Sequence, residues 1–127
     1  MSTLNSKRPV NLNLLAWIPL TAAASITHRI TGVLLLAGVG VILYSADLAL
    51  TSPEGFASAK ALISAGGIFT FLLWATLVAL VYHFYAGIKH ILLDFHIADS
   101  IGAAYWMSIA VIVLTAIDAV LLGAWLW

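Results

Sequence analysis

The sequence predicts an all-α integral membrane protein that crosses the bilayer three times. Of the 127 residues, 64% are apolar and 8% are charged, whereas soluble domains average about 45–50% apolar and about 25% charged residues. A helix needs about 20 largely apolar residues to cross the hydrocarbon core, and the chain holds three such stretches. The segments between them are too short to fold as domains, so one membrane domain, residues 1–127, is expected.

The first expected span runs from about residue 21 to residue 50. Its charged residues, Arg29 and Asp47, lie toward its two ends, and the stretch between them is uncharged. The N-terminal segment before it, residues 1–20, is polar over its first fourteen residues and is expected to lie on the membrane surface or against a partner protein.

The same N-terminal region also allows a secretory signal. The basic pair Lys7 and Arg8 precedes an apolar run, and the alanines at residues 22–24 form a small-residue cleavage site. In a secretory signal the apolar run ends near such a site, whereas here it continues far beyond the alanines. We therefore expect the N-terminus to be retained.

The second and third expected spans cover about residues 61–90 and 103–127. The second carries no Asp, Glu, Lys or Arg before its last two residues, and the third contains one acid, Asp118. A Pro/Gly turn at residues 51–55 and a short polar loop at residues 94–102 connect the spans.

Charge and cysteine content exclude several classes of function. Five Lys and Arg balance five Asp and Glu, so no basic surplus is present to bind nucleic acid. Because the chain has no cysteine, disulfides, a thiolate nucleophile and Cys-ligated metal centres are excluded. Metal or redox chemistry must therefore depend on the four histidines or on a bound cofactor.

Basic residues near the span ends predict the orientation. Lys7, Arg8, Arg29 and Lys89 fall on the N-terminal side of the membrane, and Lys60 alone falls on the other side. Lys and Arg favour the cytoplasmic side, so the N-terminus is expected inside and the C-terminus outside.

A first polar cluster opens the first span. An ionisable group at bilayer depth costs about 2.5–3.5 kcal/mol on insertion scales, so each such group needs an explanation. Ser25, His28, Arg29 and Gly32 fall within about 100° of one helical face. The Arg29 guanidinium suits a carboxylate, and the Ser25 hydroxyl can form a hydrogen bond. Gly32 permits the close approach of a flat ligand or another helix. Alternatively, Arg29 extends to the lipid headgroups without binding a ligand.

A second polar cluster ends the second span. His83 and His90 are seven residues apart, about 10 Å along the helix axis, so they cannot bracket one iron. If His83 binds haem, the other axial ligand must come from a different helix. Gly87, one turn beyond His83, leaves space where a porphyrin would lie. The alternative is a histidine that hydrogen-bonds a neighbouring helix.

The two clusters are expected to meet, because the second span returns to the side from which the first one starts. Arg29, His28, Lys89 and His90 then lie at similar depth, with His83 one to two turns deeper. A haem with its iron at His83 and its propionates at His28 and Arg29 fits this arrangement.

Asp118 is expected to make a structural hydrogen bond rather than to have a functional role. Two other functions remain open. In a small membrane transporter, Arg29, His83 and Asp118 would form a substrate or proton path. A purely structural membrane subunit would serve only the assembly of a larger complex.

Four motifs in order also carry a resemblance to a known family. They are Arg8-Pro9-Val10-Asn11-Leu12, Ser25-x-x-His28-Arg29-x-Thr31-Gly32, Ser52-Pro53-Glu54-Gly55-Phe56 and His83-x-x-x-Gly87-Ile88-Lys89-His90-x-x-x-Asp94. Together they resemble the cytochrome b membrane-anchor subunit of succinate dehydrogenase, the quinone reductase of respiratory complex II.

The resemblance implies that the chain forms half of a heterodimeric, haem-binding helical bundle with a second small three-span anchor subunit. It implies that His83 is the axial ligand of a b-type haem iron, with the second axial histidine on the partner subunit. It places His28 and Arg29 near the haem propionates, and Ser25 and Arg29 at the ubiquinone pocket.

The resemblance further implies a place in a bacterial inner (cytoplasmic) membrane, with a cytoplasmic N-terminus and a periplasmic C-terminus. The flavoprotein and iron–sulfur subunits of succinate dehydrogenase would dock on the inner face. The chain would supply anchorage and part of the site that reduces ubiquinone, and it would have no dehydrogenase chemistry of its own.

Overall fold

The structure, a computed structural model, describes residues 19–97 and 100–127, and those residues form four helices and their connections. The helices are α1 (Leu20–Thr51), α2 (Pro53–Ser64), α3 (Ile68–Asp94) and α4 (Ile101–Leu126). Three of them, α1, α3 and α4, are long and apolar enough to cross a membrane. The predicted all-helical, three-span class is therefore confirmed. The predicted surface segment, residues 1–20, lies almost wholly outside the described residues.

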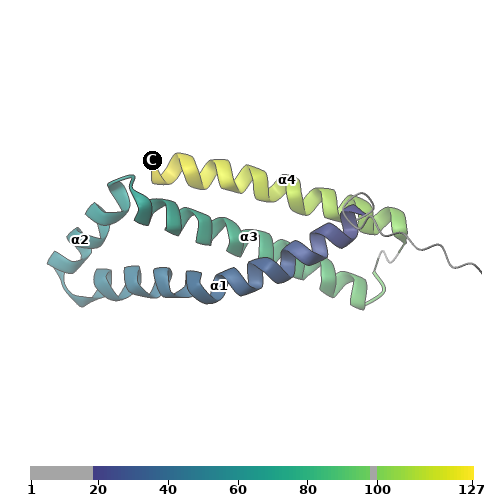
Figure 1. Cartoon of the computed structure of the whole chain (residues 1–127), viewed down its shortest axis with the longest axis horizontal. Coiled ribbons are helices and arrows are strands. Elements are labelled where there is room, and N and C mark those ends of the chain that lie inside the picture. The colour runs from purple at the N-terminus through teal and green to yellow at the C-terminus, as the bar shows by residue number, and fades with distance from the viewer. Residues whose placement is uncertain (1–18, 98–99) are drawn as a thin grey trace, which may run out of the picture.

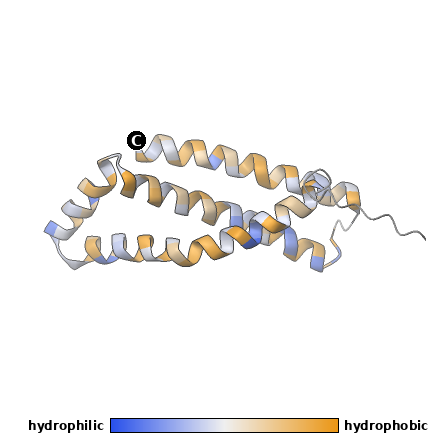
Figure 2. Cartoon of the chain, viewed as in Figure 1, coloured by the Kyte–Doolittle hydropathy of each residue, from blue (hydrophilic) through white to orange (hydrophobic). Residues whose placement is uncertain are grey.

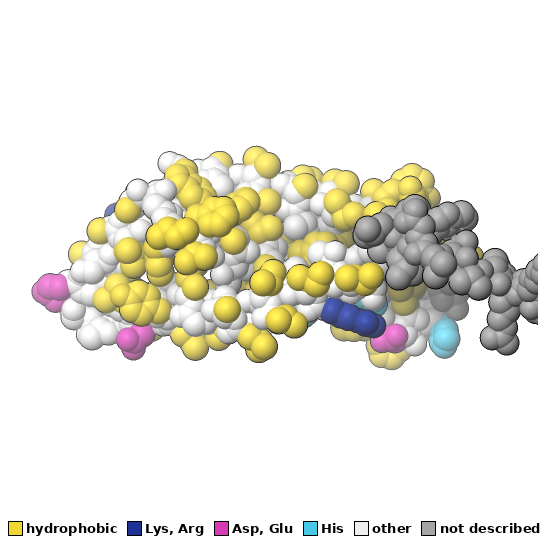
Figure 3. Space-filling model, in the orientation of Figure 1, with side chains coloured by type: hydrophobic (Ala, Val, Ile, Leu, Met, Phe, Trp, Pro, Cys, Tyr) yellow, Lys and Arg dark blue, Asp and Glu magenta, His cyan; other side chains and the backbone are white. Residues whose placement is uncertain are grey.

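The three long helices run side by side, and α2 lies across one end of the bundle (Figure 1). The central helix is α3, because it packs against both α1 and α4. Many large apolar side chains point outward, among them Leu36 at 79% exposed and Val120 at 71% exposed. Figure 3 shows hydrophobic side chains spread along the visible face, with the charged ones toward its ends. A surface of this kind suits contact with lipid or with other apolar helices.

The second expected span, residues 61–90, differs from the structure, in which its first residues belong to α2. Ser52 is extended and accepts a hydrogen bond from the Gly55 amide at 2.9 Å, so it caps α2, and Pro53 occupies the first helical turn. The chain then turns at Gly66, whose φ of 66° favours glycine, and α3 begins at Ile68. The expected turn at 51–55 is thus reduced to the break at Ser52, because Pro53 starts a helix.

The first and third spans lie close to the expected ranges. Helix α1 covers Leu20–Thr51 against the expected 21–50. Helix α4 begins at Ile101, two residues before the expected start, because the Ser100 hydroxyl accepts a hydrogen bond from the Ala103 amide at 3.2 Å.

Helices α1 and α3 approach closely in the middle of the bundle. A Cβ atom added to Gly38 would lie 2.6 Å from the Thr76 methyl carbon, closer than real Cβ contacts allow. The Thr76 hydroxyl donates to the Leu72 carbonyl of its own helix at 2.8 Å. The missing side chain at Gly38 therefore sets the distance between the two helices.

Polar side chains fix α3 against α4. The Tyr85 hydroxyl donates to an Asp118 carboxylate oxygen at 2.7 Å. The Trp74 indole N–H donates to the Ala119 carbonyl at 2.9 Å. Because hydrogen bonds between membrane helices require matched positions, both contacts fix the relative register of α3 and α4.

Candidate functional site

The candidate site lies where α1 crosses α3, at the end of the bundle away from α2. Figure 2 shows hydrophilic stretches of both ribbons at this crossing, within otherwise hydrophobic helices. The His28 and His83 rings stack there, with centroids 4.1 Å apart and planes 21° apart. The His90 ring lies 5.1 Å from His28. The structure therefore brings together His28, His83 and His90, all of which the sequence singled out.

The contacts of His83 define which of its ring nitrogens is free. Its Nδ1 lies 3.1 Å from the His28 carbonyl oxygen and 3.3 Å from the Thr31 hydroxyl oxygen. The Thr31 hydroxyl donates its own proton to backbone carbonyls of α1, at Thr27 and His28. Both neighbours of Nδ1 are thus acceptors, so the proton of the neutral ring belongs on Nδ1.

The other nitrogen, Nε2 of His83, then carries a lone pair. No residue in the described part of the chain hydrogen-bonds to it. A histidine that donates through Nδ1 to a backbone carbonyl and leaves Nε2 open has the arrangement of a metal ligand held by an outer hydrogen bond. The geometry therefore makes Nε2 of His83 the candidate ligand atom.

Two glycines border the stacked imidazoles. A Cβ atom added to Gly32 would lie 3.1 Å from Cε1 of His83, so only glycine leaves the ring its present position. A Cβ atom added to Gly87 would lie 3.7 Å from Nε2 of His28, an ordinary contact distance. Gly32 is therefore the tighter constraint, whereas a side chain at Gly87 would meet His28 at an ordinary contact distance.

His28 presents an unpaired polar atom. Its Nε2 is buried and has no hydrogen-bond partner among residues 19–97 and 100–127. A buried polar atom without a partner is costly and is rare in folded proteins. The atom is therefore available to a group outside the described residues.

Ser25 and Arg29 lie one turn apart on α1, next to the histidines. The Ser25 hydroxyl is half-buried and has no hydrogen-bond partner in the part of the chain that the structure describes. The Arg29 side chain is exposed and makes no ion pair with a described residue. The Tyr82 hydroxyl donates to the Ala24 carbonyl at 2.9 Å and ties α3 to this part of α1. A hydroxyl and a guanidinium are thus both available on one helical face.

Lys89 lies at the level expected from the sequence but faces away from the histidines. Only 3% of its surface is exposed, and its Nζ donates to the Ser108 hydroxyl of α4 at 2.8 Å. Ser108 is itself fully buried and donates to the Ala104 carbonyl at 2.8 Å. Lys89 therefore belongs to the α3–α4 interface rather than to the candidate site.

Asp118 makes the structural hydrogen bond expected for it, with Tyr85 as the donor. Tyr85 follows His83 by two residues, so the two side chains leave α3 on nearly opposite sides. The residues of the transporter alternative, Arg29, His83 and Asp118, are thus divided between two helix interfaces. The structure does not bring them together into one path.

Within the described ranges, no group of three His, Asp or Glu side chains is arranged to hold a metal ion. The site instead offers one imidazole with a free nitrogen, a second with a buried unpaired nitrogen, and a nearby hydroxyl and guanidinium. The fold and the site together define a multi-pass helical membrane protein with a histidine site between its first two spans.

The comparisons with known proteins place the chain in a family. Residues 5–122 match the succinate dehydrogenase/fumarate reductase transmembrane subunit family, and the chain belongs to that family. The resemblance seen in the four sequence motifs is therefore confirmed.

Three relatives illustrate how far the similarity extends. The succinate dehydrogenase cytochrome b556 subunit of Coxiella burnetii is 34% identical over 98% of this chain and 100% of its own length. The subunit of the same name from Paracoccus denitrificans is 36% identical over 90% of this chain and 88% of its own. The mitochondrial cytochrome b560 subunit of Bos taurus is 32% identical over 97% of this chain and 73% of its own. The chain is thus similar to these subunits over nearly its whole length.

Proposed function

We propose that the chain is a membrane-anchor subunit of a succinate:quinone oxidoreductase, complex II, that binds b-type haem and forms part of the ubiquinone-reduction site. One observation carries the proposal. His83 directs Nδ1 at a backbone carbonyl and keeps Nε2 free, with Gly32 against its ring. The names of the relatives, cytochrome b556 and cytochrome b560 subunits, support haem as the ligand.

The residues of the site fit a haem shared with a partner chain. Nε2 of His83 would bind the haem iron, and a histidine of the second small anchor subunit would also bind it. The buried, unpaired Nε2 of His28 and the unpaired guanidinium of Arg29 would bind the propionates. When bound, the haem supplies one-electron redox chemistry.

Ser25 and Arg29 would hold the quinone. The Ser25 hydroxyl, free of a partner in the described chain, would donate to a quinone carbonyl oxygen. Arg29, one turn further along α1, would stabilise the negative charge that develops on the ring as it is reduced. Protons and electrons for the reduction of ubiquinone to ubiquinol would come from outside this chain.

The family supports a set of partners. The chain would assemble with a second small membrane-anchor subunit and with the flavoprotein and iron–sulfur subunits of succinate dehydrogenase. Those soluble subunits would dock at the histidine end of the bundle, on the cytoplasmic face of a bacterial inner membrane. The N-terminus would then be cytoplasmic and the C-terminus periplasmic.

Replacement of His83 tests the proposal. In a complex purified through a tag on this chain, His83→Ala should reduce or abolish the b-type signal in a reduced-minus-oxidised optical spectrum, because the proposed ligand atom, Nε2 of His83, is lost. The control is His96→Ala, which removes an exposed histidine beyond the end of α3. Unchanged haem content and spectrum in the His83 variant would refute the assignment.

A further inference from the structure

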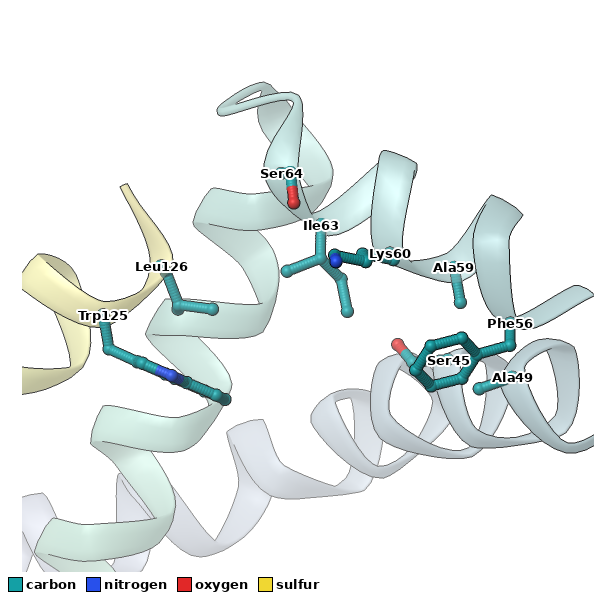
Figure 4. A pocket seen from close by; sticks show the side chains of 9 residues that line it. All are labelled: Ser45, Ala49, Phe56, Ala59, Lys60, Ile63, Ser64, Trp125 and Leu126. Atoms are coloured by element: carbon teal, nitrogen blue, oxygen red, sulfur yellow. The ribbon is translucent and has the colours of Figure 1, made fainter.

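A second candidate site lies at the opposite end of the bundle from the histidines. A cavity of about 360 Å³ opens between α1, α2 and the C-terminal end of α4 (Figure 4). Its walls are mainly apolar and include Phe56, Ile63, Trp125 and Leu126. Among the described residues that line it, Lys60 is the only one with an ionisable side chain. The cavity therefore combines an apolar interior with a single positive charge.

Lys60 has no carboxylate to neutralise it. Its side chain is exposed and forms no ion pair with any residue the structure describes. The acid on the same helix, Glu54, is six residues earlier, about 120° around the axis. Lys60, Ile63 and Ser64 all line the cavity (Figure 4), as their i, i+3 and i+4 spacing on α2 allows. The Lys60 ammonium is therefore available to an anion that enters the cavity.

Two serine hydroxyl groups line the same cavity as the Lys60 ammonium. Ser45 and Ser64 both line the cavity. The Ser45 hydroxyl donates to the Val41 carbonyl at 2.7 Å and keeps its own lone pairs. The Ser64 hydroxyl has no partner in the described part of the chain, and Figure 4 shows it pointing toward the cavity. Ser64 can therefore donate a hydrogen bond to an anionic oxygen beside Lys60.

The depth of the cavity limits the chemistry of its occupant. Helix α2 lies across the ends of the spans, near the last residues of α1 and α4 (Figure 1). Tryptophan is enriched at the level of the lipid headgroups, and Trp125 forms one wall. The charged part of the cavity thus lies at headgroup level, and its apolar walls extend toward the acyl chains. An occupant must be anionic at one end and apolar at the other.

We propose that this cavity binds an anionic phospholipid of the surrounding membrane. The ammonium of Lys60 and the hydroxyl of Ser64 would contact the phosphate, and an acyl chain would lie against Phe56, Ile63 and Trp125. One lysine at a membrane surface is worth about a fivefold change in binding of an anionic lipid. The site would be separate from the histidine site and independent of haem or quinone.

The test uses the tagged full-length chain with every polypeptide that co-purifies, delipidated in detergent and analysed by native mass spectrometry. Phosphatidylglycerol and phosphatidylcholine with identical acyl chains are added in turn. We expect the fraction carrying one phosphatidylglycerol to exceed that carrying phosphatidylcholine by about fivefold. Lys60→Gln should remove this preference, Lys60→Arg should keep it, and Glu54→Gln, on the same helix but outside the cavity, should not reduce it.

A second variant tests the apolar half of the site. Ala49 is half-buried and lines the cavity, so Ala49→Leu would fill part of it and should reduce the retention of both lipids. Equal retention of the two lipids, or an unchanged preference in Lys60→Gln, would overturn the proposal. Displacement of phosphatidylglycerol by millimolar inorganic phosphate would indicate a free-anion site instead. Cross-linking of the cavity to a co-purifying polypeptide would indicate a protein occupant, and either result rejects the lipid.

Discussion

A methyl group added at Gly32 should disturb the proposed haem site without removing any of its polar groups. The Cβ atom of Gly32→Ala would lie 3.1 Å from Cε1 of His83 and 3.6 Å from its Nδ1. Carbon atoms in contact normally lie about 3.5–4.0 Å apart, so the ring must move by a few tenths of an ångström. A bound group tolerates displacement of its ligands by about 0.5 Å. The shift therefore reaches the limit at which ligation weakens.

The displaced ring also loses its outer hydrogen bond. The contacts of Nδ1 with the His28 carbonyl and the Thr31 hydroxyl are already 3.1 and 3.3 Å long. A further shift would lengthen both beyond hydrogen-bonding distance. Loss of an outer hydrogen bond to a metal-ligating histidine typically costs about 10–100-fold in affinity. We expect Gly32→Ala to lower haem affinity by at least about tenfold.

The assay is the haem-to-protein ratio of the purified complex, measured while a haem-scavenging protein is added. Gly40→Ala is the matched control, because it adds the same methyl group to the same helix and meets nothing within 4 Å. Gly40→Ala should behave as wild type. The reasoning fails if Gly32→Ala keeps wild-type haem retention and an unshifted spectrum in an assembled complex.

Three further predictions follow from the other contacts. Gly38→Ala should destabilise the bundle by about 1–3 kcal/mol, because the added methyl overpacks the α1–α3 contact; a thermal midpoint equal to that of wild type would contradict it. Tyr85→Phe should lower the thermal midpoint by leaving Asp118 without its donor, and a second change, Asp118→Leu, should restore it; a double variant as unstable as the single one would argue against that pairing. Arg29→Ala should lower quinone reductase kcat by roughly 10²-fold, as for loss of an oxyanion donor, and Ser25→Ala should mainly raise KM for quinone; wild-type kinetics with haem retained would reject both roles.

Much of the fold could be predicted from the sequence because hydropathy and helix length are local properties. The ends of α1 lie within one residue of the predicted span. The predicted start of the second span, residue 61, lies several residues before the start of α3, because residues 61–63 are apolar and do not signal that α2 ends at Ser64. The positive φ of Gly66, which separates the two helices, has no signature in hydropathy. A helix break that depends on the backbone φ angle of one glycine is therefore seen only in the structure.

The site could be predicted in part. The depth of a residue in the membrane follows from its position along the helix, whereas the rotation of the helix about its axis does not follow from the sequence. Stacking of His28 on His83 agrees with the predicted meeting of the two polar clusters. Lys89 turns toward Ser108, a direction set by the packing of α4 that the sequence of α3 alone does not specify. His90 joins the imidazole group through His28, and its seven-residue spacing from His83 was the available signal. The direction in which a side chain leaves its helix, as for Lys89, is therefore the part of the site that the sequence alone does not specify.

The most direct test of the central claim is a reduced-minus-oxidised optical spectrum of the tagged wild-type chain, purified in mild detergent, with every co-purifying polypeptide identified. The account predicts a b-type haem spectrum together with a flavoprotein, an iron–sulfur protein and a second small membrane chain. A chain that purifies with neither haem nor those subunits would contradict it.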